Sequence, residues 1–153
     1  MKIVIAGDSA GAPLCQIIGK HLQGRPDVQV TDLSAPKESE PEFYAHTSER
    51  AAKAVAAGDY DRGILFCGTG IGVCIAANKI PGIRAAQAHD TYSAERAAKS
   101  NNAQIITLGA RVVGPELAKA IVDSFLVSDF DPKGSSAKNV EALDELDSRY
   151  SKG

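Results

Sequence analysis

A cysteine followed by a glycine-rich turn is the part of this sequence best suited to chemistry. Cys67 ends a short apolar run, and Gly68, Gly70 and Gly72 follow it at alternate positions before a helical pattern begins. This spacing predicts a strand, a tight loop and the start of a helix. Open parallel sheets bind ligands beyond the carboxyl ends of their strands, and the amides of a helix N-terminus favour a thiolate and stabilise an oxyanion. Cys67 is therefore predicted to be a catalytic base or nucleophile.

Polar residues follow two other predicted strands. Asp8 and Ser9 come after the apolar run 3–6, and His89 and Asp90 come after residues 83–88. Aspartate and serine are common helix N-caps, so capping alone explains them as well as ligand binding does. A histidine beside an aspartate can also form an acid–base pair. Both interpretations stay open for the two pairs.

The glycine loop differs from the known nucleotide-binding loops. A dinucleotide fingerprint places its third glycine one residue later and follows the first strand, and a P-loop carries a lysine and a hydroxyl residue that this loop lacks. A nucleotide site is therefore disfavoured. A site for a small anion or an enediolate remains, as does a tight turn without any ligand. For Cys15 and Cys74 the simpler interpretation, a buried small hydrophobe, is preferred.

Length and composition set wider limits. The chain has 153 residues and a net charge of −2, without a basic block, so neither nucleic acid nor an anionic membrane is an expected partner. The apolar runs are far shorter than the ~20 residues of a membrane span. Three cysteines without metal-ligand spacing indicate a reducing, cytoplasmic location and no metal site. Residues 1–153 are expected to form one domain.

Strand-like and helix-like segments alternate along the chain, which predicts a parallel sheet with helices on both faces. The predicted fold is an α/β three-layer sandwich with five strands in the flavodoxin-like, Rossmann-like order 2-1-3-4-5. That order places Asp8 and Ser9 beside Cys67. Residues 34–42 are predicted to be a loop. An extra helix over residues 137–150 has no strand to cover, so we expect it to pack on a partner subunit. The five expected strands are 3–6, 28–33, 63–67, 83–88 and 104–108.

Several segments in order along the chain resemble one enzyme family. The sequence is similar to the type B ribose-5-phosphate isomerases and the bacterial galactose-6-phosphate isomerases, and the stretch from Cys67 to Arg84 is the most specific part of the resemblance. The matching segments are Gly7–Gly11, Tyr44–His46, Cys67–Gly72, Ala76–Lys79, Gly82–Ala85, Asn101–Ala103 and Gly109–Gly114.

The resemblance implies a cofactor-free aldose–ketose isomerase that acts on a sugar phosphate through an enediolate. It makes Cys67 the base and Thr69 the acid or proton relay, while the amides of Gly68, Gly70, Ile71 and Gly72 hold the oxyanion. It also implies a dimer or tetramer in which neighbouring subunits complete each other's active sites. The sugar is expected to contact Asp8, Ser9, Tyr44, His89, Ser100 and Asn101, and the phosphate to contact Arg111, Ser135 and Lys138.

Three positions depart from the family's usual pattern. Ser9 and Ser100 stand where the ribose-5-phosphate isomerases usually carry histidines, and the second of these is the ring-opening residue. The C-terminal segment has Lys138 where arginines are usual. Ribose 5-phosphate closes to a furanose through its 4-hydroxyl, whereas a four-carbon sugar 4-phosphate has that oxygen esterified and needs no ring opener. The chain therefore also resembles the branch that interconverts erythrulose 4-phosphate and erythrose 4-phosphate.

Two other functions are compatible with the pattern. One is a non-catalytic sugar-phosphate-binding protein that has kept the fold after losing both histidines. The other is a flavodoxin-like module that binds a nucleotide or flavin, although the required loops are missing. On the ribose interpretation, His89 would replace the missing imidazole at Ser100. The sequence favours the four-carbon substrate slightly over ribose 5-phosphate.

Overall fold

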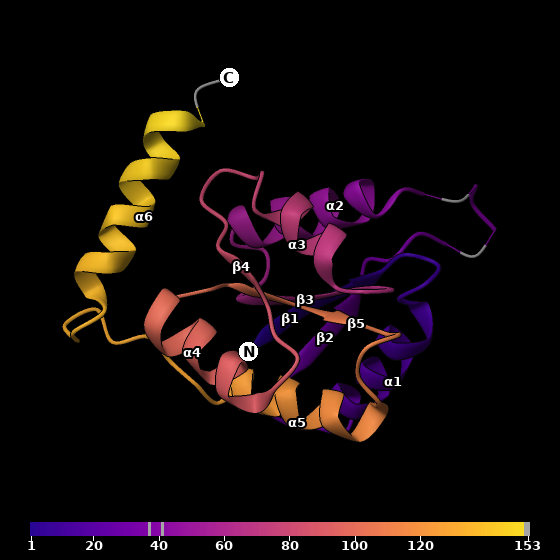
Figure 1. Ribbon diagram of the computed structural model, residues 1–153. Coiled ribbons are helices and arrows are strands. Elements are labelled where there is room, and N and C mark those ends of the chain that lie inside the picture. The colour runs from indigo at the N-terminus through magenta and orange to yellow at the C-terminus, as the bar shows by residue number, and fades with distance from the viewer. Residues whose placement is uncertain (37, 41, 152–153) are drawn as a thin grey trace.

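The computed structural model of the protein describes residues 1–36, 38–40 and 42–151. A parallel sheet crosses the middle of the molecule, and helices cover both of its faces (Figure 1). This arrangement confirms the predicted α/β class. The strands are β1 Lys2–Gly7, β2 Gln29–Asp32, β3 Arg62–Cys67, β4 Ala85–Gln87 and β5 Ile105–Gly109.

Each strand is followed by a helix that crosses back over the sheet. One face is covered by α1 Ala12–Gln23, α4 Thr91–Asn101 and α5 Pro115–Leu126, and the other by α2 Tyr44–Ala56 and α3 Ile71–Ala77 (Figure 1). The two faces have separate apolar cores because successive residues of a strand point to opposite sides. In β3, Ile64 and Phe66 pack toward α1 and α5, whereas Leu65 and Cys67 pack toward α2 and α3.

The predicted strand order was wrong at one end of the sheet. The order is β2-β1-β3-β5-β4, so β5 lies beside β3 and β4 forms the edge. A strand buried on both faces is almost wholly apolar, and all five residues of Ile105–Gly109 are buried. The short segment Ala85–Gln87 is only partly buried and pairs with β5 alone. The more apolar strand therefore takes the inner position.

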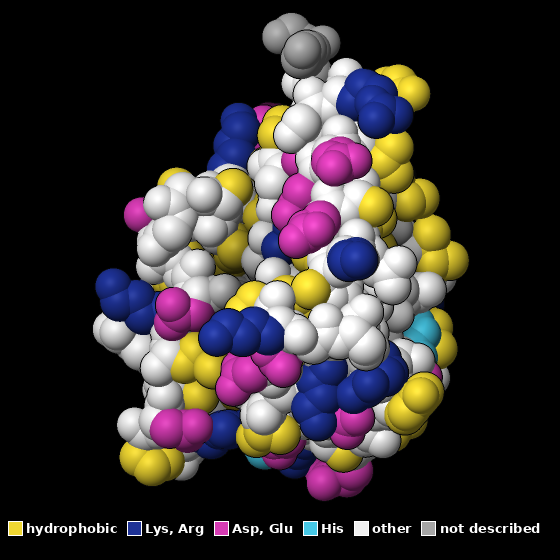
Figure 2. All heavy atoms as spheres, turned by 90° about the vertical axis from the view of Figure 1, so that its left-hand side faces the viewer, with side chains coloured by type: hydrophobic (Ala, Val, Ile, Leu, Met, Phe, Trp, Pro, Cys, Tyr) yellow, Lys and Arg dark blue, Asp and Glu magenta, His cyan; other side chains and the backbone are white. Residues whose placement is uncertain are grey.

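The last helix, α6 Ala137–Tyr150, stands apart from the sandwich (Figure 1). Val140 is its buried anchor, and Asp144 accepts a 2.7 Å hydrogen bond from the Arg84 guanidinium. Figure 2 shows hydrophobic side chains in a row along one edge of this upper part of the molecule, beside charged ones. The exposed apolar residues of α6 are Leu143, Leu146 and Tyr150.

Two further expectations concern the rest of the chain. Residues 34–42 form a loop wherever they are described, while positions 37 and 41 of that loop lie outside the described residues. Within the described part of the chain, no helix is long and apolar enough to cross a membrane.

Candidate active site

The Cys67 thiol lies where β3 ends, at the edge of the sheet that all five strands reach with their carboxyl ends; we call this the carboxyl edge. The residue is 5% exposed. Its Sγ accepts a 3.1 Å hydrogen bond from the Gly70 amide at the start of α3. The contact fits the predicted geometry, because it aims a backbone donor of the glycine loop at the sulfur.

Gly70 of the loop and Gly109 of β5 are required to be glycine for two different reasons. Gly70 has a φ of 75°, in the left-handed region that favours glycine, and it is the N-cap of α3. Gly109 faces the loop across β5, where an added Cβ would lie 2.5 Å from the Thr69 carbonyl carbon. The loop backbone therefore packs directly against the end of β5, which holds it close to Cys67.

The carbonyls of Thr69 and Gly70 in the loop each accept a hydrogen bond from a side chain outside the loop. The Thr69 carbonyl accepts a 2.7 Å hydrogen bond from Gln87 Nε2, and the Gly70 carbonyl accepts a 2.8 Å hydrogen bond from Thr107 Oγ1. Thr69 is exposed, and its Oγ1 accepts a 3.2 Å hydrogen bond from the Ile71 amide. The predicted acid and the predicted base are thus both bonded to amides of one loop.

A cavity of about 530 Å³ opens at the carboxyl edge of β1 and β2. β1 pairs with β3, as predicted. Asp8 and Ser9 line the cavity, but Cys67 is not among its lining residues. Asp8 Oδ1 also accepts a 2.8 Å hydrogen bond from the Gly11 amide, so it stabilises its own turn. The other polar lining residues include Gln16, Asp32, Ser34, Ser39, Glu40, Glu42 and Thr47.

His89 is half-buried and already has a partner on one ring nitrogen. Its Nε2 accepts a 2.9 Å hydrogen bond from the Gly109 amide, which requires that nitrogen to be unprotonated. Burial lowers the pKa of His89, and Asp90 opposes that shift. Asp90 itself caps α4, accepting a 2.6 Å hydrogen bond from the Ser93 amide. The capping interpretation is therefore correct for Asp90, and Nε2 of His89 is occupied.

The side chains of Tyr44 and Arg111 both lie against the glycine loop, although Tyr44 precedes the loop in the sequence and Arg111 follows it. A Cβ added at Gly72 would lie 2.7 Å from Tyr44 Cε2, and one added at Gly68 would lie 3.0 Å from Arg111 Nη1. The absence of both Cβ atoms lets the two side chains lie directly over the backbone. Arg111 is exposed, so its guanidinium is available to an anion at the carboxyl edge.

The remaining predicted site residues form a second group. Within a single chain, this group lies away from Cys67. Ser100 and Asn101 end α4, which begins next to His89 and runs away from the carboxyl edge for 11 residues. That length corresponds to about 16 Å along the helix axis. Ser135 lies in the turn before α6 and Lys138 in its first turn; α6 packs on α4, and both residues are exposed. The expected site is therefore divided between two edges of the molecule.

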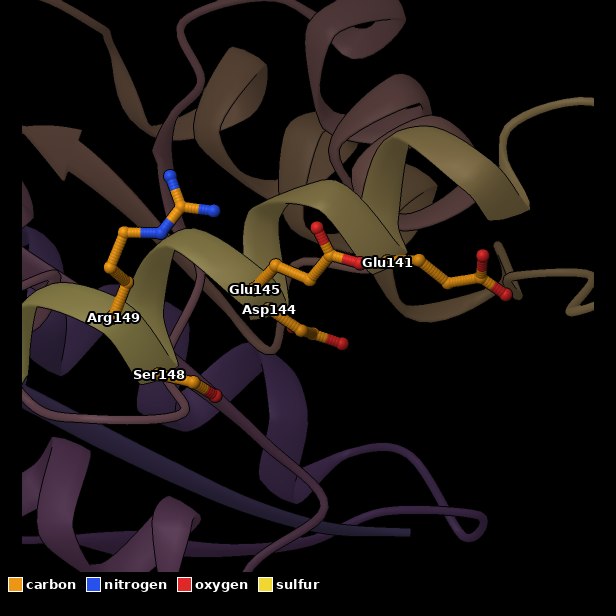
Figure 3. A pocket seen from close by; sticks show the side chains of 5 residues that line it. All are labelled: Glu141, Asp144, Glu145, Ser148 and Arg149. Atoms are coloured by element: carbon orange, nitrogen blue, oxygen red, sulfur yellow. The ribbon is translucent and has the colours of Figure 1, made fainter.

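A second hollow of about 610 Å³ lies along α6 (Figure 3). All of its lining side chains come from that one helix, and none is a predicted substrate contact. A single exposed helix cannot enclose a ligand, so the carboxyl edge is the better candidate site. The lining residues are Glu141, Asp144, Glu145, Ser148 and Arg149.

The other two cysteines differ from each other. Cys15 is buried, as predicted, and burial raises the pKa of its thiol to about 12, with a further contribution from Asp32. Cys74 is only half-buried, so its prediction as a core residue was wrong; its Sγ donates a hydrogen bond to the Ala85 carbonyl at 3.5 Å. Across residues 1–36, 38–40 and 42–151, no three His, Cys, Asp or Glu side chains gather as a metal site would require.

Sequence reasoning missed Gln87 and Thr107, which contact the loop, and Asp32 and Ser34, which line the cavity. A signal existed for Asp32 and Ser34, because they end or follow a predicted parallel strand just as Asp8 does. Gln87 and Thr107 gave a weaker signal, a polar residue within each of two short strands. Their importance depends on the strand order, which was predicted wrongly.

The geometry defines a parallel α/β protein with a thiol and a glycine loop at the carboxyl edge. The chain belongs to the Ribose/Galactose Isomerase family, whose model matches residues 3–143. The chain is accordingly an isomerase.

Individual relatives agree with this assignment. D-erythrulose-4-phosphate isomerase of Pectobacterium atrosepticum is 51% identical over 138 residues, which cover 90% of each protein. Ribose-5-P isomerase B of Listeria innocua is 49% identical over 149 residues, covering 97% of this chain and 99% of the relative. The solved structure of ribose-5-phosphate isomerase B from Clostridium thermocellum superposes with a TM-score of 0.91 at 41% identity, covering 98% and 99% of the two chains.

Proposed function

We propose that this isomerase interconverts the aldose and ketose forms of a short sugar phosphate through an enediolate, with Cys67 as the base. The observation that carries the proposal is the Gly70 amide aimed at Cys67 Sγ at the carboxyl edge, where the neighbouring strand β1 leads to Asp8 and Ser9 in the wall of a cavity. The names of the relatives, which include isomerases of erythrulose 4-phosphate and ribose 5-phosphate, support the substrate class.

Each group in the loop has a role in the proposed proton transfer. Cys67 thiolate takes the proton from the carbon next to the carbonyl and returns it to the former carbonyl carbon. Thr69 relays a proton from the substrate hydroxyl that becomes the new carbonyl to the substrate oxygen that becomes a hydroxyl. The amides of residues 68–72 stabilise the negative charge on the enediolate oxygen, because preorganised donors act strongly in a site that excludes water.

The charges around the site indicate how the substrate is oriented. Among the described residues that line the cavity beside Asp8, Asp32, Glu40 and Glu42 contribute further carboxylates, and their negative charge disfavours a phosphate there. Glu42 is paired with the guanidinium of Arg50 at 2.7 Å. We therefore place the sugar hydroxyls toward Asp8 and the phosphate toward the exposed guanidinium of Arg111.

The preferred substrate is proposed to be a four-carbon sugar phosphate. His89 Nε2 accepts the Gly109 amide and burial lowers the pKa of the ring, so this nitrogen is a poor candidate for opening a furanose. Ser100 offers no imidazole in its place. A tetrose 4-phosphate does not require ring opening. Two relatives named D-erythrulose-4-phosphate isomerases, 51% and 46% identical, support this choice.

The divided site is proposed to be completed by a second copy of the chain. Asn101, Ser135 and Lys138 lie at the far end of α4 and the start of α6, away from Cys67. The exposed apolar residues Leu143 and Leu146 give α6 a face suited to packing on another subunit. In such a dimer the α4–α6 corner of one chain would supply Lys138 to the phosphate held by Arg111 of the other.

A substrate panel tests the activity and the chain length together. Turnover is measured on four-, five- and six-carbon aldose phosphates, with wild-type protein and the His89→Ala variant. Fastest turnover of erythrose 4-phosphate, with little loss in the variant, supports the proposal. Much faster turnover of ribose 5-phosphate that is lost in His89→Ala contradicts the four-carbon choice. Thermal stabilisation by sugar phosphates without any turnover would favour the non-catalytic binding protein.

A mixing experiment tests whether two chains share a site. Cys67→Ala and Asn101→Ala are each expected to be inactive, but a refolded equimolar mixture would regain about a quarter of wild-type activity, because half of the dimers are mixed and each mixed dimer has one intact site. A mixture that stays inactive, although both variants form dimers by light scattering, argues that each chain builds its own site.

A further inference from the structure

We infer that Gln87 of β4 and Thr107 of β5 are positioning residues that orient the loop amides bonded to Cys67 and Thr69. The inference rests on the proposed roles of Cys67 and Thr69. Neither Gln87 nor Thr107 was assigned a function by the sequence pattern. Each donates a hydrogen bond to a loop carbonyl, at 2.7 Å to Thr69 and at 2.8 Å to Gly70.

The geometry of a trans peptide links each of these bonds to the site. The carbonyl and the N–H of one planar peptide group point in opposite directions, so a partner that fixes the carbonyl also fixes the N–H. Gln87 holds the peptide between Thr69 and Gly70 by its oxygen, and the N–H of that same peptide donates to Cys67 Sγ at 3.1 Å.

Thr107 acts on the next peptide in the same way. Its Oγ1 holds the Gly70 carbonyl, and the N–H of that peptide, which belongs to Ile71, donates to Thr69 Oγ1 at 3.2 Å. A hydroxyl oxygen that accepts this bond still has its own proton to donate. By fixing the amide that bonds to the Thr69 oxygen, Thr107 leaves the Thr69 hydroxyl proton to be donated to a substrate oxygen.

The strand order explains why these two residues reach the loop. β5 lies between β3 and β4, and Thr107 is the register partner of Leu65 on one side and of Gln87 on the other. Thr107 is fully buried, at 0% exposure, on the same side of β5 as Ile105, which packs in the apolar core under α3. A hydroxyl in such a place is costly unless it is bonded, and its bond goes to the loop.

A bonded carbonyl also changes the amide chemically. Hydrogen bonds in a chain polarise one another, so an amide whose oxygen accepts a bond is a stronger donor at its nitrogen. The Gln87 bond thus strengthens the N–H that stabilises the Cys67 thiolate, while the Thr107 bond strengthens the N–H on Thr69. The two positioning residues are predicted to affect different steps, which makes them separable by experiment.

The first experiment replaces the exposed Gln87 by Leu, which removes the donor and keeps the length of the side chain. The matched control is Gln104→Leu, because Gln104 Nε2 likewise donates to a loop carbonyl, that of Gly82 at 2.8 Å, far from the thiol. The rate of Cys67 alkylation by iodoacetamide is followed from pH 5 to 10 by mass spectrometry of the peptide that carries it. The midpoint of the Gln87→Leu profile is expected to move to higher pH by about half a pH unit or more. Coinciding profiles for Gln87→Leu and wild type overturn the role of Gln87.

The second experiment replaces Thr107 by Val, which removes only the hydroxyl. The matched control is Ser48→Ala, since Ser48 is also fully buried and its hydroxyl donates at 3.2 Å to another carbonyl of α3, that of Val73. Thr107→Val is expected to lower kcat about tenfold with little change in KM and in the alkylation profile, and Thr107→Ser to restore kcat. If Thr107→Val loses no more kcat than Ser48→Ala, or if Ser does not restore it, Thr107 is only a structural residue.

The failure of this inference differs from the failure of the proposed function. If Cys67→Ala keeps full turnover, Cys67 is not the base, whatever the other variants do. If Cys67→Ala abolishes turnover while Gln87→Leu and Thr107→Val both behave like their controls, the base is confirmed and the positioning roles are wrong.

Discussion

Cys67 and Cys15 are both buried cysteines, yet their surroundings differ in one decisive respect. Cys15 lies in α1, 1% exposed, where burial raises the pKa of its thiol to about 12 and the Ser34 hydroxyl contacts its sulfur at 3.8 Å. Cys67 is 5% exposed and receives a backbone N–H at 3.1 Å. Burial alone keeps a thiol neutral and inert. On the proposed function, the backbone donor aimed at the sulfur, rather than burial, distinguishes the base from the structural cysteine.

The largest expected effect is a difference in turnover between the alanine variants of Cys67 and Cys15. Cys67→Ala is expected to lower turnover at least about 1,000-fold, because it removes the group that moves the proton, whereas Cys15→Ala is expected to keep most of the activity. Turnover and thermal unfolding are measured on both variants. Equal losses in the two, with both still folded, would remove the distinction.

An intermediate effect is expected on the pH dependence of the stability, to which Cys15 contributes. The raised pKa of Cys15 means that the unfolded chain loses its thiol proton near pH 9 while the folded chain keeps it until about pH 12. The stability that this thiol contributes is complete below pH 9 and is lost as the pH rises toward 12. At pH 10 the loss is about 1.4 kcal/mol. The free energy of unfolding in urea is measured at pH 7.5 and pH 10 for the Cys67→Ala variant and for the double variant that also carries Cys15→Ala. If both variants lose the same stability between the two pH values, the loss does not come from Cys15.

The smallest effect is expected at the third cysteine. Cys74 is half-buried and donates to the Ala85 carbonyl at 3.5 Å, and a serine hydroxyl can make the same bond. Cys74→Ser is therefore expected to change turnover less than about twofold and the free energy of unfolding by less than about 1 kcal/mol. A large loss of turnover would mean that a second thiol takes part in the reaction.

The sequence predicted the number and type of elements well, because their signals are local. The run Ile64–Cys67 reads as a strand from its own residues, and the helix over 137–150 was placed within its observed bounds, Ala137–Tyr150. The strand order was not predicted, since it depends on which strand is better buried between its neighbours. Comparing Ile105–Leu108 with Ala85–Gln87 would have indicated that the first belongs inside the sheet.

The candidate site was predicted in part for the same reason. Cys67 and Asp8 were predicted as site residues because each lies where a strand ends, and strand ends meet at the carboxyl edge, whereas the role of Thr69 was expected through the family resemblance. Asn101 and Lys138 were expected through a family resemblance, which does not say which chain supplies them. The roles inferred for Gln87 and Thr107 depend on hydrogen bonds to backbone oxygens, and no residue pattern encodes such bonds.

The short strand β4 has a consequence for motion at the site. Ala85–Gln87 pairs with β5 on one side only, whereas β3 and β5 are flanked on both sides. Outer strands open most readily, so deuterium is expected to enter the amides of residues 85–87 before those of the inner strands. If Gln87 holds the glycine loop, each opening of β4 also releases the loop. The lifetime of the closed edge strand would then limit how long the loop amides stay in the arrangement that catalysis needs.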